Sequence, residues 1–266
     1  MVDNLRHDSL EPYFNEDTLA ENNGHPYWEK LSLLFNLAES LEKARGKHDP
    51  NRPIQIDYNF YVEDGKVRIV GRRRGSPMDK LVAELMILAN ATWGQLLADK
   101  GVPGLYRGQV AGKVRMTTSA LPHEGLGVAC YAWSTSPLRR YSDLINQWQL
   151  IAVLSDKPAP FPPRSAELFA AMRDFDLTYS GYADFQRRME RYWCLRWLMQ
   201  TGTVQAEGSL LRNAPNVRVD GLPLVVQVPS APAELAPGSR IRLALGEPDL
   251  LELSVHSRFE AVIKGN

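Results

Sequence analysis

The sequence predicts an α+β protein in two parts: long helices mixed with sheet over residues 1–200, and a small β-barrel over residues 201–266. Two observations carry this prediction. Apolar residues recur at helical spacing in four long segments before residue 200. From Thr201 onward, apolar and polar residues alternate in short runs between turn signals, which indicates about five short strands.

The first helix is expected over about residues 26–45, and a β-hairpin follows it. The strand-like runs 54–62 and 66–70 flank Asp64-Gly65, a strong signal for a short turn. The basic run 72–74 closes the hairpin. Solvated charge is the plainer interpretation of this run, and RNA contact is the alternative.

The second helix is expected from Ser76-Pro77, where Asp79 completes a capping pattern, to about Gly101. Because it is apolar on most sides, we expect it to be buried. Residues 101–129 are rich in Gly, Pro, Ser and Thr, and they predict a long ordered loop or a set of short elements.

Ser136 and Pro137 predict the start of a third helix, as a cap and a first helical residue. A Pro-rich connector over 157–164 leads to a long helix over about 165–199, with a bend near Gly181. The face that we expect the third helix to bury consists of Leu138, Tyr141, Leu144, Ile145, Trp148, Ile151 and Ala152.

Composition limits the classes of function. The 31 Lys and Arg residues balance 31 Asp and Glu residues, so a polyanion binder driven by overall charge is excluded and any nucleic-acid site would be a local patch. Cys130 and Cys194 form no close motif, which favours a reduced, cytoplasmic setting. We expect no membrane span and no signal peptide. The histidines are scattered, and none has zinc-ligand spacing.

The stretch WSTSPLRRYSDL, residues 133–144, is expected to place Arg139 and Arg140 in the first turn of the third helix. The helix dipole disfavours each cation there by about 0.3–1 kcal/mol. One interpretation is an ordinary helix start whose arginines reach solvent or pair with Asp143. The other is an anion site, in which helix N–H groups, hydroxyls and two guanidiniums bind phosphate while Asp143 holds Arg139 in one rotamer.

The segment PHEGLGVACYAWSTSPLRRYSDLINQWQ, residues 122–149, resembles the signature of the ribonuclease II catalytic family, also called the RNB domain. That signature is a Gly-Leu-Gly segment, a tyrosine, and then Thr-Ser-Pro-(Ile/Leu)-Arg-(Arg/Lys)-Tyr-x-Asp-Leu. KLVAELMILAN, residues 80–90, resembles a second block of the family, a helix buried near the active site. The resemblance implies the C-terminal part of an RNB-type catalytic domain over 1–200. Position and strand pattern imply an S1-like OB barrel over 201–266.

Members of this family hydrolyse single-stranded RNA from the 3′ end and release nucleoside 5′-monophosphates. The resemblance implies that Arg139 is the catalytic arginine at the phosphate near the scissile bond and that Arg140 helps to grip the RNA. Metal ions and a guanidinium suit an in-line displacement at phosphorus, where negative charge must be stabilised. The residues that the resemblance assigns to substrate binding are Thr135, Ser136, Tyr141, Asp143, Glu84 and Glu190.

Glu84 and Glu190 are the two substrate-binding assignments that need comment. Glu84 lies on a largely apolar helix, where pairing with Lys80 or capping of a backbone group is favoured over RNA contact. Glu190 stands where relatives have an acid close to the RNA path.

Trp133 replaces a histidine found in many members. The terminal barrel has Phe259 as its single aromatic residue over 201–263, which predicts weak RNA affinity.

The family holds Mg²⁺ with four aspartates in the pattern D-x(5)-D-x-D-D, which this sequence lacks. We therefore assign no metal ligand in this chain. We expect the missing N-terminal half of the catalytic domain in cis or in another chain, and the isolated chain to be close to inactive. The alternatives are a non-catalytic RNA-binding protein or truncated pseudo-enzyme, and an unrelated helical domain with a phosphate-ligand site.

Overall fold

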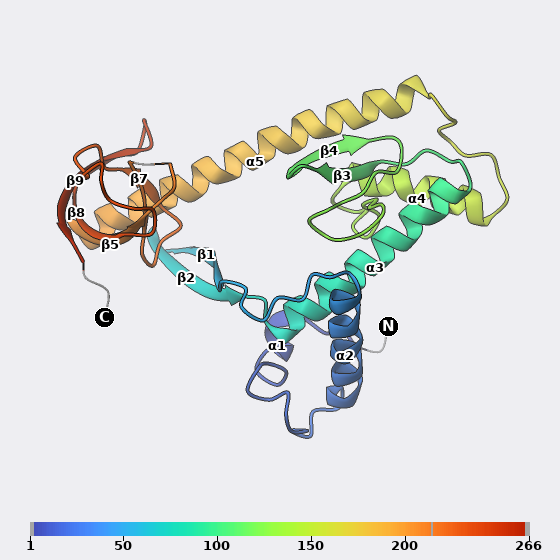
Figure 1. Cartoon of the computed structure of the whole chain (residues 1–266), viewed down its shortest axis with the longest axis horizontal. Coiled ribbons are helices and arrows are strands. Elements are labelled where there is room, and N and C mark those ends of the chain that lie inside the picture. The colour runs from blue at the N-terminus through green and yellow to red at the C-terminus, as the bar shows by residue number, and fades with distance from the viewer. Residues whose placement is uncertain (1–2, 214, 264–266) are drawn as a thin grey trace. The chain divides into compact units, whose positions relative to one another are not determined.

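The computed structural model of the chain describes residues 3–213 and 215–263 and divides into two compact units. Unit 1 spans Met1–Ile54 and Gly75–Ser180, and unit 2 spans Gln55–Arg74 and Gly181–Asn266 (Figure 1). The first hairpin thus belongs with the C-terminal residues rather than with the helices that flank it in sequence. The assignment of family domains to 1–200 and 201–266 stays a prediction.

Unit 1 begins with three helices: α1 (His7–Leu10), α2 (Trp28–Ala44) and α3 (Pro77–Asp99). The predicted cap of α3 is confirmed, because the Ser76 hydroxyl accepts the Asp79 N–H at 3.3 Å and the Asp79 carboxylate accepts the Gly75 N–H at 2.9 Å. These helices enclose a small apolar cluster. Its buried members are Leu10, Phe14, Leu31, Met78 and Leu81.

By length and composition, α3 is long and apolar enough to cross a membrane. This finding corrects the expectation that no apolar run reaches that length. Two polar side chains of α3, Glu84 and Asn90, are buried and bonded to other segments of unit 1. Such contacts are typical of the central helix of a packed fold.

Residues 101–129 contain a hairpin of β3 (Tyr106–Val110) and β4 (Lys113–Thr117). Its two-residue turn places Ala111 at φ 54° and Gly112 at φ 82°. A turn of this kind usually has Asn or Asp first. The alanine therefore hid the hairpin from sequence reasoning, which left this region as a loop or short elements.

Helix α4 (Tyr141–Leu154) differs from its prediction in two ways. It begins five residues after Ser136, with Arg140 as its N-cap in extended conformation. Its buried face is also more polar than the spacing of apolar residues predicts. Tyr141, Trp148 and Ile151 are exposed, and Leu138 in the preceding turn is fully exposed. The residues that α4 buries are Ser142, Asp143, Ile145, Asn146, Gln149, Leu150 and Ala152.

Helix α5 (Ala166–Thr201) runs through Gly181, where the two units divide, and the bend predicted there stays a prediction.

Unit 2 contains the predicted hairpin of β1 (Gln55–Glu63) and β2 (Lys66–Arg74). A five-stranded antiparallel sheet follows in the order β7-β6-β5-β8-β9. Its strands are β5 (Gln205–Leu210), β6 (Asn216–Val219), β7 (Val225–Gln227), β8 (Arg240–Asp249) and β9 (Ser254–Val262).

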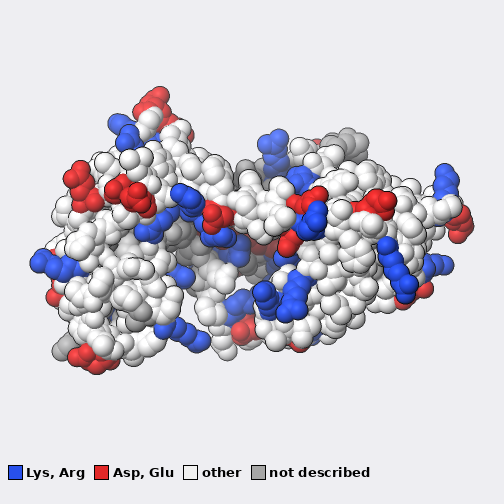
Figure 2. All heavy atoms as spheres, turned by 90° about the horizontal axis from the view of Figure 1, so that it is seen from above, with Lys and Arg blue, Asp and Glu red and all other residues white. Residues whose placement is uncertain are grey.

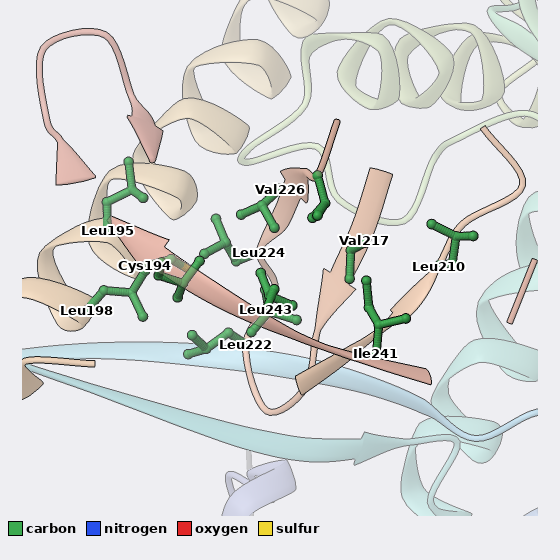
Figure 3. Packing of buried hydrophobic residues seen from close by; sticks show 13 residues of the cluster. Cys194, Leu195, Leu198, Leu210, Val217, Leu222, Leu224, Val226, Ile241 and Leu243 are labelled. Atoms are coloured by element: carbon green, nitrogen blue, oxygen red, sulfur yellow. The ribbon is translucent and has the colours of Figure 1, made fainter. Parts of the chain in front are cut away.

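The sheet of unit 2 is curled and holds the largest apolar cluster among the described residues. Cys194, Leu195 and Leu198 of α5 lie beside strand residues such as Val226 and Leu243 (Figure 3). Figure 3 shows these side chains filling the space between the helix and the sheet. The coarse prediction of helices followed by a small antiparallel sheet of about five strands is confirmed.

Hydrogen bonds that involve side chains connect β9 and α5 to other parts of this curled sheet. The Ser257 hydroxyl donates to the Gln227 carbonyl, and the Phe259 N–H donates to the Ser230 hydroxyl at 2.8 Å. From α5, the Arg191 guanidinium donates to the carbonyls of Val225, at 2.7 Å, and Leu253. Burial lowers the pKa of Arg191, and the two carbonyls satisfy two of its donors.

Candidate functional site

The two arginines of the predicted site lie in the turn before α4, not within the helix. The N–H groups of Arg139 and Arg140 both donate to the Ser136 carbonyl, at 3.2 and 3.0 Å. This closes a turn over residues 136–140, which we call the arginine turn. Because the turn precedes the first helical residue, the side chain of Arg139 is free to extend away from the helix axis.

Asp143 holds the arginine turn against α4. Its buried carboxylate accepts from the Ser136 N–H at 2.8 Å, the Arg140 guanidinium at 2.7 Å and the Ser142 hydroxyl at 3.1 Å. Arg139 was the expected partner of Asp143, and the structure corrects that partner to Arg140. Arg139 is exposed and has no ion-pair partner among the described residues.

Trp133 lies beneath two guanidinium groups. The Arg140 guanidinium carbon is 4.1 Å from the Trp133 ring centroid, and that of Arg107 from β3 is 4.0 Å away. Tyr179 packs edge-on to the indole with a centroid distance of 5.8 Å. Cation–π contacts of this kind fix a guanidinium without consuming its N–H donors. Sequence reasoning missed Arg107, whose only signal was a cation inside the strand run LYRGQV.

Two buried asparagines hold the extended segment that carries Trp133. The Asn146 amide accepts from Leu105 N–H at 2.7 Å and donates to the carbonyls of Leu105, at 2.9 Å, and Trp133, at 2.7 Å. The Asn90 amide accepts from Ser134 N–H at 2.9 Å and donates to the Thr135 hydroxyl at 3.4 Å. Asn90 therefore has a structural role in unit 1. Thr135 is thereby tied to α3.

Glu84 pairs with Arg45, which corrects the predicted partner, Lys80. The Arg45 guanidinium donates to the Glu84 carboxylate and to the Leu126 carbonyl in the Gly-Leu-Gly loop. Lys80 instead pairs with Glu42, at 3.3 Å, and with Glu39. Glu84 thus anchors the loop through Arg45, which is a structural role within unit 1.

The remaining predicted site residues are placed differently. Ser136 takes part through its backbone, as described above. Tyr141 is about half exposed and packs edge-on to Trp148 at 6.3 Å, so it does not lie on the buried face of α4 as expected. Glu190 belongs to unit 2 and accepts a hydrogen bond from Gln186 at 3.1 Å. Unit 1 therefore brings together Thr135, Ser136, Arg140 and Asp143, with Arg139 open beside them.

Figure 2 shows Lys and Arg interspersed with Asp and Glu on the face in view. The arginine turn differs locally, because Arg107, Arg139 and Arg140 are accompanied by the single buried carboxylate of Asp143. Such an excess of guanidinium groups suits an anionic ligand.

No group of three or more His, Cys, Asp or Glu side chains in the described parts of the chain has metal-binding geometry. Asp143, the carboxylate at the arginine turn, already accepts three hydrogen bonds. The described residues therefore do not fit the Mg²⁺ site that the resemblance implies.

Comparison with known proteins gives the family to which this fold and its arginine turn belong. The sequence matches the RNB domain family over residues 4–119 and 109–156, which is more than half of the chain. The chain therefore belongs to the RNB domain family. The predicted resemblance to this family is confirmed.

Curated relatives are ribonucleases. The uncharacterized ribonuclease sll1290 of Synechocystis is 29% identical over 206 residues, which cover 64% of this chain and 30% of the relative. Exoribonuclease 2 of Escherichia coli is 24% identical over 189 residues, which cover 50% of this chain and 29% of the relative. The chain thus spans about a third of the length of these relatives.

Solved structures of similar fold are also exoribonucleases. A Dss1 exoribonuclease mutant from Candida glabrata matches with a TM-score of 0.77 at 20% identity, over 90% of this chain and 36% of the other. Mycoplasma genitalium RNase R in complex with ribose-methylated single-stranded RNA matches with a TM-score of 0.74 at 15% identity, over 95% of this chain and 52% of the other. These likenesses establish the fold.

Proposed function

We propose that this chain is the RNA-gripping part of a 3′→5′ exoribonuclease of the ribonuclease II type, which hydrolyses single-stranded RNA to nucleoside 5′-monophosphates. The observation that carries the proposal is the arginine turn, in which Arg140 is fixed by Asp143 at 2.7 Å while Arg139 is exposed and unpaired among the described residues. A guanidinium kept free of carboxylates next to a rigid anchor suits a phosphate group.

In this proposal Arg139 binds the phosphate near the scissile bond and stabilises the charge that develops there. Arg140 has a positioning role, because its guanidinium is held by the Asp143 carboxylate and lies over the Trp133 ring. Thr135 and Ser136 shape the turn, Tyr141 lies at its exposed edge, and Glu190 lines the RNA path further along. The curled sheet of unit 2 acts as an S1-like OB module of weak RNA affinity.

The proposal assigns the metal-binding half of the catalytic domain to sequence outside this chain, in cis or on another chain, in a cytoplasmic setting. Mg²⁺ would supply the nucleophile and charge stabilisation for the complete enzyme. The apolar side chains that α4 exposes, Tyr141, Trp148, Ile151 and Leu154, support a covering segment on this helix. The match to sll1290 covers 30% of that relative, which also supports a catalytic domain with a further part.

Two measurements test this function. Incubation of the chain with 3′-labelled single-stranded RNA and Mg²⁺ is expected to release almost no mononucleotide, and robust release would contradict the incomplete site. In EDTA, Arg139→Ala should weaken binding of fluorescein-labelled oligouridylate about tenfold with unchanged melting temperature. Equal RNA affinity of the unaltered chain and of Arg139→Ala would refute the phosphate role of Arg139. RNA would then bind elsewhere on the chain, which would favour the non-catalytic alternative.

A further inference from the structure

Arg107 is a half-buried cation whose charge no carboxylate of the described residues neutralises. It lies on β3, and its guanidinium packs over the Trp133 indole at 4.0 Å. Burial lowers the pKa of Arg107, an effect that Tyr179 and Asp176 partly oppose from a distance. Asp176 acts only through this longer-range attraction. In the described parts of the chain, Arg107 forms no ion pair with Asp176 or with any other carboxylate.

Arg140 provides the contrast on the same indole. Its guanidinium is 4.1 Å from the ring centroid, but it also donates to the Asp143 carboxylate. Asp143 accepts two further hydrogen bonds, from Ser136 and Ser142, and its ion pair in the described parts of the chain is with Arg140 rather than with Arg107. Two guanidiniums on one aromatic ring share one ion-paired carboxylate, and Asp176 acts on Arg107 only from a distance. Burial of a charge is unfavourable unless a partner offsets it.

The indole holds Arg107 in a defined position. Trp133 is fixed by Tyr179 at its edge and by the bond from Asn146 to its carbonyl. Stacking occupies the face of a guanidinium and leaves the N–H groups in its plane free. Those N–H groups match the geometry of two phosphate oxygens, whereas a single ammonium or hydroxyl would not. The ligand that fits this arrangement is a doubly accepting oxyanion.

We propose that Arg107 is a second phosphate-binding residue, which contacts a backbone phosphate of the RNA strand separately from Arg139. The inference rests on the proposed function, since RNA is the polymer that offers successive phosphates to one site. Trp133 then acts as a positioning residue for both Arg107 and Arg140.

Salt dependence of RNA binding tests the proposal directly. For single-stranded nucleic acid, each neutralised phosphate adds about 0.7 to the slope of log affinity against log salt concentration. In EDTA, with fluorescein-labelled oligouridylate and the full chain, Arg107→Gln should weaken binding about tenfold and reduce the slope by about 0.7. Arg107→Lys should keep the slope but lose part of the affinity, because it retains the charge without the planar fork.

Arg115→Gln is the matched control, since Arg115 is an exposed arginine on the adjacent strand β4. Equal losses from Arg107→Gln and Arg115→Gln would overturn the proposal, because they would indicate a general charge effect. Reduced affinity with an unchanged slope would also overturn it and would indicate lost packing on Trp133. If Arg139→Ala weakens binding but Arg107→Gln does not, this inference fails alone. If the unaltered chain does not bind the RNA, both proposals fail.

Discussion

The Arg140 guanidinium and the Asp143 carboxylate form a short ion pair, 2.7 Å long, that ties the arginine turn to the first turn of α4. The side chain of Asp143 is fully buried and that of Arg140 is 12% exposed. Asp143 is the third residue of α4, where the helix dipole stabilises an anion. The conflict that the sequence suggested, cations at the positive end of a helix, is therefore relieved by a carboxylate of the same helix.

Removal of this carboxylate should destabilise unit 1. Asp143→Ala leaves the Arg140 charge and the Ser136 N–H without partners, and breaking a buried pair in this way costs about 3–5 kcal/mol. Thermal melting followed by circular dichroism should show a clear fall in melting temperature. Asp174→Ala is the control, because Asp174 pairs with Arg173 on the exposed surface at 3.1 Å and should contribute about 0–1 kcal/mol. Similar effects of both substitutions would show that the buried pair is not structural.

Asn146 should be as important as an apolar core residue of α4. Its amide makes three bonds to the backbone of Leu105 and Trp133, so Asn146→Leu would leave one donor and two acceptors unsatisfied. Each such group costs about 1–3 kcal/mol when buried. We expect a large loss of stability by urea unfolding, together with weaker RNA binding, because Trp133 loses its anchor. Ile151→Ala on the exposed face of the same helix should change little, and a comparable loss from it would contradict this account.

Gly127 of the Gly-Leu-Gly loop should not tolerate a side chain. It has φ +67°, and a Cβ there would lie 2.5 Å from the Arg45 carbonyl oxygen. Gly112 provides a matched control, because it has φ +82° and a Cβ added there would meet no atom within 4 Å. Gly112→Ala should cost about 1–2 kcal/mol from backbone strain alone, and Gly127→Ala should cost distinctly more. Equal melting temperatures for the two variants would exclude a close approach between the loop and α2.

The sequence predicted the elements of this fold better than the contacts of its site. Helices α2, α3 and α5 and the strands of unit 2 follow from local periodicity, because their buried faces are mainly apolar. Helix α4 violates that rule. Its buried Asn146 and Gln149 bind backbone groups of segments up to 46 residues away in sequence, which no local pattern encodes. Ile145 and Ala152 are buried as expected, whereas the other apolar positions expected on the buried face of α4 are half-buried or exposed.

The partners of the charged side chains were unpredictable for the same reason. Glu84 has Lys80 one helical turn before it, but its partner is Arg45 at the end of another helix. Asp143 was expected to pair with Arg139 at the favourable spacing of four residues, but the turn before α4 brings Arg140 to it instead. Arg107 could be recognised only after the fold placed β3 against Trp133. The family signature located the site, whereas the three-dimensional contacts determined which arginine is free.

Glu42 should make stability depend on pH on the acid side. Its buried carboxylate faces His48, Lys80 and Arg52. Burial raises the pKa of Glu42, but hydrogen bonds and charge attraction from His48, Lys80 and Arg52 outweigh it, so the net shift is below the ordinary value of 4.5. The stabilisation is therefore present above pH 4.5 and is lost as pH falls through the lowered pKa. Urea unfolding measured over this range should show a steeper acid decline for the unaltered chain than for Glu42→Gln, with Glu16→Gln as an exposed control. Parallel curves for all three proteins would contradict this role.

Both cysteines should resist alkylation in the folded protein. Cys194 is fully buried in the core of unit 2, and burial raises the pKa of its thiol to about 12. Burial also raises the pKa of Cys130, whose thiol contacts the Ala91 carbonyl and Gln95. Because the thiolate is the reactive form, iodoacetamide near pH 8 should modify neither residue until urea unfolds the chain. Mass spectrometry of the intact protein measures the modification, and peptide mapping assigns it. Rapid labelling of Cys194 without denaturant would show that the packing of α5 against the curled sheet opens readily in solution, since the thiol has no other route to the reagent.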